Sequence, residues 1–195
     1  MSSVSSTVRF RCGRCSREYE ARVYSFIDAA SSPALTGQVT DGSLFVRECP
    51  SCGCRELVNL PVVYRDASCL VCLSDREIGV EGLEGMRGRL VSDVGSLVEK
   101  VKIFHAGLDD VAMELVKLVI RGELGRDVQL RFLRTEGADN ELIFTYPSEG
   151  RMEMVAVGFN VYEDSCGIVS RSPELSAAHE GMVRVDREWV ENFIR

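Results

Sequence analysis

The sequence predicts an α+β fold in three parts, and three patterns in the 195-residue chain support this. Two C-x-x-C steps lie between short β-prone runs in the N-terminal third. Apolar residues then recur every three or four positions over residues 92–119, as on one face of a helix. They alternate over residues 128–159, as in strands. We expect the three parts to span residues 1–90, 91–125 and 126–195.

The two C-x-x-C steps are Cys12-Gly-Arg-Cys15 and Cys49-Pro-Ser-Cys52. Four thiolates are the number that a tetrahedral structural zinc site requires, and a two-residue spacer lets both sulfurs reach one ion about 2.3 Å away. Glycine tolerates positive φ, so Gly13 and Gly53 should ease the two turns. We therefore predict a zinc ribbon that binds one structural Zn²⁺ through the thiolates of Cys12, Cys15, Cys49 and Cys52.

Strands are expected on both sides of each cysteine step. Residues 8–10 and 18–24 predict a strand and its return around the first step, and residues 44–46 and 57–64 predict the same around the second. A helical insertion over residues 28–43 separates the two units. It explains why 33 residues lie between the two steps, more than the roughly 15–20 common in simple ribbons.

The insertion has helix signals at both ends. Ser32 and Pro33 are typical of an N-cap and a first helical residue, and Asp41-Gly42 should end the helix. Residues 75–89 are rich in Gly and Glu and predict a loop.

The order of short motifs along this part is specific. In sequence they are Tyr24-Ser-Phe-Ile-Asp28, Pro33-Ala-Leu35, Asp41-Gly-Ser-Leu44, Cys49-Pro-Ser-Cys-Gly53, Leu60-Pro-Val-Val-Tyr64 and Lys102–Asp110. This order resembles the CpXC family, prokaryotic zinc-ribbon-like proteins named for paired Cys-Pro-x-Cys knuckles. The resemblance covers about residues 8–125 and implies that the family's four cysteines are Cys12, Cys15, Cys49 and Cys52. Gly13 stands where proline is usual, and the resemblance implies a fold and a metal but no reaction.

The second part predicts a helical hairpin. A helix should run from Ser92 to Phe104 and break at residues 105–107. Asp109 or Asp110 should cap a second helix. Because the link is so short, the two helices should pack antiparallel. The pair Asp109-Asp110 could also be a paired-carboxylate site, but acidic residues are typical of helix N-termini, so we interpret it as a cap.

The third part predicts an antiparallel β-meander and a terminal helix. Strands are expected at residues 128–132, 142–146 and 152–159, with turns between them. Within residues 164–181 we expect only a helix that begins after Ser172-Pro173. The terminal helix should be capped by Asp186 and face the body of the protein with Trp189, Val190, Phe193 and Ile194.

The other cysteines are predicted not to bind the metal. Cys69-Leu-Val-Cys72 is a third C-x-x-C step, but it lies in an apolar run that predicts a strand. Residues three apart in a strand point to opposite faces, so these two cysteines are interpreted as core residues. Cys54 could compete with Cys52 for the metal, although its one-residue spacing makes it a poor partner. Cys166 stands alone and should be structural or free.

Charge is unevenly distributed along the chain. The net charge is −7, whereas residues 1–60 hold seven Arg, no Lys and six acidic residues, a balance of +1 that leaves −8 for the remainder. A basic zinc ribbon is a candidate for nucleic-acid binding. Alternatively, the cations offset the net charge of about −2 on Zn²⁺ with four thiolates. We favour this alternative for the arginines that crowd the knuckles: Arg9, Arg11, Arg14, Arg17, Arg47 and Arg55.

Catalytic motifs are not found in the sequence. H-E-x-x-H, G-x-S-x-G and the Walker loop are missing, and the only histidines, His105 and His179, are far apart. A catalytic zinc keeps a position open for water, and four thiolates leave none. We therefore predict a zinc-stabilised binding module that engages a protein partner or a small ligand. The alternatives are an enzyme with a site in the C-terminal half, or at the junction of the halves, and a nucleic-acid-binding ribbon.

The sequence also predicts a location. Residues 1–7 lack the apolar core of a signal peptide, and no run of 18 apolar residues could span a membrane. Eight cysteines without an export signal are expected to be reduced, with metal binding favoured over disulfides. We therefore expect a cytoplasmic protein, whose oligomeric state the sequence does not predict.

Overall fold

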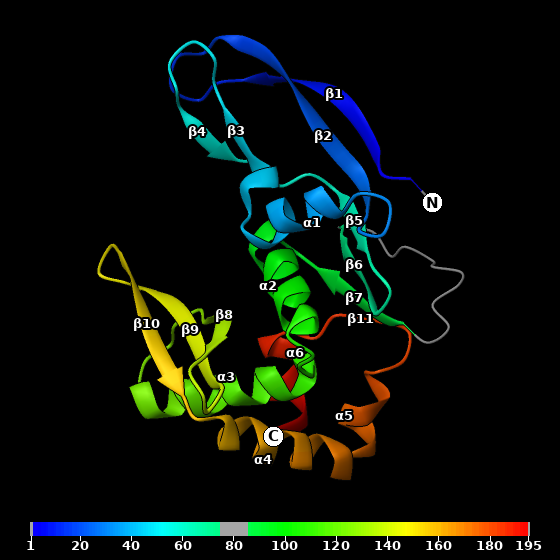
Figure 1. Cartoon of the computed structure of the whole chain (residues 1–195). Coiled ribbons are helices and arrows are strands. Elements are labelled where there is room, and N and C mark those ends of the chain that lie inside the picture. Colours follow the sequence, from blue (N-terminus) through cyan, green and yellow to red (C-terminus); the bar gives the residue numbers. More distant parts are fainter. Residues whose placement is uncertain (1, 75–85, 195) are drawn as a thin grey trace.

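The computed structural model describes residues 2–74 and 86–194, and it has a mixed α+β fold, as predicted. In this part of the chain the strands form sheets of six, three and two strands, with helices packed between and beneath them (Figure 1). Most of the predicted loop at 75–89 lies outside the described residues, whereas its end belongs to strand β7 (Arg87–Val91). None of the described helices is long and apolar enough to cross a membrane.

The six-stranded sheet connects the N-terminal hairpin to the C-terminal segment. In spatial order its strands are β1 (Val4–Arg11), β2 (Glu18–Asp28), β5 (Val62–Arg65), β6 (Cys69–Leu73), β7 and β11 (Met182–Val183). The β1–β2 and β5–β6 pairs are antiparallel, and the other neighbours are parallel. The predicted division of the chain at residues 90 and 125 stays a prediction.

The second hairpin consists of β3 (Val46–Glu48) and β4 (Arg55–Leu57) and forms its own two-stranded sheet. The single strand predicted over residues 57–64 is therefore wrong, because β4 ends at Leu57 and β5 begins at Val62 in the other sheet. Pro61 has no N–H to donate to a ladder, which suits a crossing between sheets. The strand expected at residues 44–46 begins only at Val46, since the preceding residues form the short helix η1 (Ser43–Phe45).

Helix α1 (Pro33–Thr40) begins and ends as predicted. The side chain of Ser32 does not cap it, and its hydroxyl instead accepts a hydrogen bond from Ser3 Oγ at 2.9 Å. Helix α2 (Val94–His105) packs on the six-stranded sheet and buries Leu97 and Val101 in a core shared with β5, β6 and β7.

Helix α3 (Asp110–Leu124) follows α2 after a short turn. Figure 1 shows α3 crossing the end of α2 rather than lying alongside it, so the antiparallel hairpin predicted for the two helices does not form. Gly107 allows this turn because it has a φ of 69°, and the N–H of Leu108 bonds the carbonyl of Ile103.

The second core lies around α3. It is covered by three antiparallel strands, β8 (Arg131–Glu136), β9 (Glu141–Ser148) and β10 (Arg151–Val157), and by α4 (Phe159–Arg171) and α5 (Pro173–Ala177). The predicted third strand is too long, because Gly158 begins α4. Helix α4 itself was missed. Its buried residues are Tyr162, Ser165 and Val169, a narrow face that includes a polar residue and gives little helical signal.

Helix α6 (Arg187–Ile194) closes this core as predicted. Asp186 accepts a hydrogen bond from the N–H of Trp189, and Val190 is fully buried. Phe193 does not face the body as expected, since 43% of it is exposed. The side chain of Ile194 lies outside the described residues.

Candidate functional site

The two cysteine steps adopt the same backbone turn. In the first, the N–H of Cys12 bonds the carbonyl of Arg17 at 3.0 Å, and the N–H of Ser16 bonds that of Cys12 at 2.9 Å. In the second, the N–H of Cys49 bonds the carbonyl of Cys54 at 2.8 Å, and the N–H of Gly53 bonds the carbonyl of Cys49 at 2.9 Å. The two turns are therefore equivalent, position for position.

The equivalence corrects one prediction. Each turn needs a left-handed residue at the same place, and these are Gly53, with a φ of 68°, and Ser16, with a φ of 59°. Gly13 is not among the described residues with positive φ, so it does not ease its turn in this way. Its N–H instead donates to Glu56 Oε1 at 2.9 Å, which joins the first turn to strand β4.

The structure brings the four predicted thiols together. The Sγ atoms of Cys12, Cys15, Cys49 and Cys52 all lie within 4.8 Å of one another, and none forms a disulfide. Cys12 Sγ is 3.6 Å from Cys52 Sγ, and Cys15 Sγ is 3.7 Å from Cys49 Sγ. A tetrahedral ion with bonds of 2.3 Å places its sulfurs about 3.8 Å apart, so the four thiols can hold one metal ion.

The electrostatics of the cluster suit a cation. The backbone N–H of Cys15 lowers the pKa of Cys12 to about 6, helped by the N–H of Arg14 and by the thiol of Cys52. The N–H of Cys54 acts in the same direction on Cys52, but burial and the three other thiols raise the pKa of Cys52 to about 12. Thiolates at this spacing repel one another, so full ionisation of the cluster requires a bound cation.

Cys54 and Glu56 lie beside the cluster. Together with Cys12 they form a second group whose potential ligand atoms are within 4.8 Å of one another. This group lacks the other three thiols and supplies only three ligands, whereas the four-cysteine group supplies a complete tetrahedral set. Burial raises the pKa of the Cys54 thiol, followed by the charge of Cys12.

The third C-x-x-C step is part of a core, as predicted. Cys69 and Cys72 are fully buried in β6, and all five residues of this strand are buried. Burial raises the pKa of Cys72 to about 11, and burial together with Asp66 raises that of Cys69. Neither thiol belongs to a group of potential ligands among the described residues.

The arginines near the cluster have varied partners. Arg17 lies 3.5 Å from Ser51 Oγ and so connects the two turns, while Arg47 donates to the carbonyls of Leu44 and Val46 at 2.6 and 3.0 Å. Arg9 is 70% exposed and stands 3.9 Å from two glutamates of β2. Some of the arginines near the cluster therefore contact groups of the two hairpins themselves.

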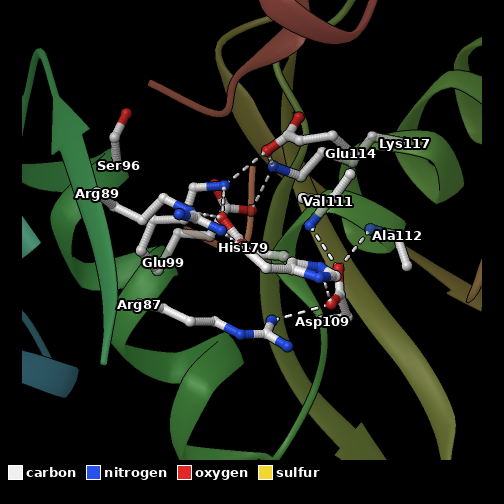
Figure 2. A network of polar contacts seen from close by, with 12 residues as sticks. Arg87, Arg89, Ser96, Glu99, Asp109, Val111, Ala112, Glu114, Lys117 and His179 are labelled. Carbon is white, nitrogen blue, oxygen red and sulfur yellow. Dashed lines mark hydrogen bonds and ion pairs between the residues drawn. The ribbon is translucent and has the colours of Figure 1, made fainter. Parts of the chain in front are cut away.

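A second cluster of charged side chains lies where β7, α2 and α3 meet (Figure 2). Arg89 donates from Nε and Nη2 to both carboxylate oxygens of Asp110, at 2.7 and 2.8 Å, and both side chains are fully buried. Lys100 Nζ lies 2.8 Å from the same carboxylate. Of the two residues that we predicted as candidates for the helix cap, Asp109 is the cap, and its Oδ1 accepts from the N–H groups of Val111 and Ala112. The buried role of Asp110 was missed.

This charge network continues along α3. Lys117 Nζ lies 2.8 Å from Glu99 Oε1 and 2.9 Å from Glu114 Oε1, and Glu99 also accepts from the N–H of Phe132 on β8 at 2.6 Å. Burial alone would raise the pKa of Glu114, but Lys117 and Lys100 outweigh it and lower that pKa. Burial likewise opposes the charge of Lys117, yet Glu114 and Glu99 raise its pKa. Both groups are therefore held in their charged forms.

A cavity of about 470 Å³ adjoins the network. Its walls come from α2, α3, the segment that leads into β8, and α6 with the residues before it. Nearly all of its charged side chains are paired, for example Arg131 with Glu99 at 3.2 Å. The cavity is the kind of concave polar site that could hold a small molecule.

The two histidines lie at different places. His105 Nε2 is 3.0 Å from the Tyr64 hydroxyl and 3.1 Å from Asp66 Oδ2, whereas His179 Nε2 is 2.7 Å from Asp109 Oδ2. Each is therefore paired with an aspartate on the protein. The sequence contains no signal that would have predicted either pair.

Comparison with known proteins gives one result. Residues 10–117 match the family model described as CpXC protein, which is more than half of the chain and includes all four clustered cysteines. Neither the curated proteins nor the solved structures contain a match.

Proposed function

Because the chain belongs to the CpXC protein family, and four of its thiols converge, we propose that it is a binding module stabilised by one structural Zn²⁺. The module engages a protein partner or a small ligand by contact and catalyses no reaction. The observation that carries this proposal is the cluster of Cys12, Cys15, Cys49 and Cys52. Four thiolates fill a tetrahedral coordination sphere and leave no position for a substrate or a reactive water.

Zinc is the ion that suits this ligand set best. Thiolates are soft ligands, and a tetrahedral set of four sulfurs is typical of zinc or of iron–sulfur sites. The spacing of 3.6–3.7 Å between sulfurs fits a single ion. The ion would join two hairpins that share little apolar core, since most of β1 is exposed. Metal binding then supplies stability that packing does not.

The charge network argues against acid–base catalysis at the cavity. A general acid or base works best with a pKa near the operating pH. Here the pKa of Glu114 is lowered and that of Lys117 is raised, which moves both groups away from neutrality. Their charges are fixed, as in a structural or a binding site.

The location and the excluded partners are part of the same proposal. The protein works in the cytoplasm of a prokaryotic cell, where free thiols persist, and the eight cysteines of the structure are all free. Nucleic acid is not the partner, because the part of the chain after residue 60 carries −8 and repels phosphate backbones.

Affinity purification from the native cell tests this proposal, with a zinc-free variant, Cys49→Ser with Cys52→Ser, as the control. A partner or ligand that is retained by the intact protein and lost with the control supports it. Titration with labelled DNA and RNA tests the alternative, since phosphate contacts make affinity fall steeply with salt. Submicromolar binding at physiological salt that is lost in Arg14→Glu with Arg17→Glu, while zinc is retained, would overturn the proposal.

A further inference from the structure

The cavity beside the charge network is lined in part by a side chain whose buried hydrogen-bond donors have no partner among the described residues. It is lined by nearly equal numbers of acidic and basic side chains, and most of them are in contact with each other. Lys117 pairs with Glu99 and Glu114, Arg131 pairs with Asp93 and Glu99, and Arg187 contacts Asp127 and Glu191.

Arg121 is different. It lies in the last turn of α3 and lines the cavity. Its Nε and Nη1 atoms are buried, and neither has a hydrogen-bond partner among the described residues. A guanidinium cannot give up its charge at neutral pH, so these two donors stay costly until an acceptor reaches them.

The surroundings of Arg121 say what kind of acceptor is missing. Burial lowers the pKa of Arg121, and the positive charge of Arg187 lowers it further, while the nearby carboxylates of Glu114, Glu191 and Asp127 oppose this shift without accepting a hydrogen bond from Nε or Nη1 of Arg121. The charge of Arg187 is already paired with Asp127 and Glu191, so the unpaired donors of Arg121 are the ones that favour an anion in the cavity. Acidic residues in the same lining, among them Asp127, Glu188 and Glu191, limit how much negative charge the cavity accepts. A volume of about 470 Å³ holds a small molecule but not a polymer.

We propose that this cavity binds a small oxyanion-bearing ligand, with a carboxylate or phosphate group that accepts hydrogen bonds from the guanidinium of Arg121. The inference rests on the proposed binding function and deepens it, because it names the chemical class of the small ligand and the residue that anchors it. The paired lysines and glutamates of the network hold the wall in place, and Arg121 supplies the free donors.

Titration of the zinc-loaded protein tests this proposal, with acetate, succinate and inorganic phosphate as separate probes at constant ionic strength. The readouts are the ¹⁵N resonance of the Arg121 Nε–H group and calorimetric binding. We expect at least one probe to shift that resonance and to saturate at concentrations up to roughly 10 mM. Succinate and phosphate distinguish a carboxylate ligand from a phosphate ligand.

Two variants make the test specific. Arg121→Gln keeps a polar side chain but removes the charge, so the dissociation constant of the active probe should rise by roughly ten- to a hundredfold. Arg126→Gln removes the same charge from an exposed residue outside the cavity and should leave the constant unchanged. If Arg121→Gln does not fold, Arg121→Lys is measured in its place. The shift of the Arg121 Nε–H resonance in the wild-type protein still shows whether a probe binds there.

Three results would overturn the inference: no shift with any probe, unchanged binding in Arg121→Gln, or an equal loss in Arg126→Gln. Zinc content is measured on the same samples. A zinc-loaded, folded protein that binds no probe refutes this inference alone, whereas a folded protein without zinc refutes the proposed metal-stabilised module.

Discussion

Replacing Asp110 by asparagine should destabilise the protein strongly. Asp110 is fully buried, accepts two hydrogen bonds from Arg89 at 2.7 and 2.8 Å, and lies 2.8 Å from Lys100. The asparagine has nearly the same volume, so packing changes little. The carboxylate charge is lost, however, and two buried cations lose their shared partner.

The expected magnitude follows from the balance of charges. The three buried cations Arg89, Lys100 and Lys117 face the three buried carboxylates of Asp110, Glu114 and Glu99. Removing one carboxylate leaves one positive charge uncompensated. Breaking a buried pair in this way costs about 3–5 kcal/mol. That is a large share of the roughly 5–15 kcal/mol that stabilises a typical domain, and it should lower the Tm by roughly 6–20 °C.

Urea denaturation followed by circular dichroism measures this loss, and Asp109→Asn is a matched control on the neighbouring residue. Asp109 is an N-cap and has partly exposed pairs with Arg87 and His179. Asparagine caps a helix about as well as aspartate, so the control should cost less than about 1 kcal/mol. A loss of less than 1 kcal/mol in Asp110→Asn, or an equal loss in both variants, would refute the reasoning.

Three further predictions concern other parts of the chain. Changing Cys69 and Cys72 together to valine should leave one zinc per chain, since both lie in the core, and loss of zinc from a folded variant would contradict the ligand assignment. Ser16→Gly should raise the free energy of unfolding by about 0.5–1 kcal/mol, because glycine adopts a φ of 59° without strain, and a loss in urea titration would contradict this. Because the pKa of Glu114 is lowered, its carboxylate stabilises the fold at pH above its ordinary pKa of 4.5, and this stabilisation is lost as the pH falls. Because the pKa of Lys117 is raised, its ammonium group stabilises the fold at pH below its ordinary pKa of 10.5, and this stabilisation is lost as the pH rises. Stability measured against pH should therefore fall at both extremes, and a curve flat through pH 3 would contradict the network.

The metal cluster could be predicted from the sequence because it depends on local geometry. A C-x-x-C step fixes the distance between its two sulfurs, and two steps flanked by strands leave few ways to arrange four thiols. The sequence correctly predicted positive φ at Gly53 in the second turn, but it did not reveal which residue of the first turn adopts the left-handed conformation. The glycine at position 13 suggested the wrong residue, because Ser16 adopts it without any sequence signal.

The parts of the fold that were missed depend on contacts between distant segments. β11 pairs with β7 across almost half of the chain, and a two-residue strand has no detectable periodicity. Helix α4 buries a narrow face, so its apolar spacing is weak. The pairing of Arg89 with Asp110 joins strand β7 to the first residue of helix α3. The local sequence suggested only a helix cap for Asp110. Buried charge pairs of this kind are decided by tertiary packing.

Metal content is the measurement that tests the central claim most directly. Elemental analysis of protein purified without added metal should find one zinc per chain, lost in Cys49→Ser and retained in Cys54→Ser, whose thiol lies outside the four-cysteine group. Apparent binding to structural thiolate sites is on the order of 10 kcal/mol, so the zinc-free variant should also lose most of the stability of the ribbon. A well-folded chain without bound metal, or equal loss of zinc in both variants, would contradict the account.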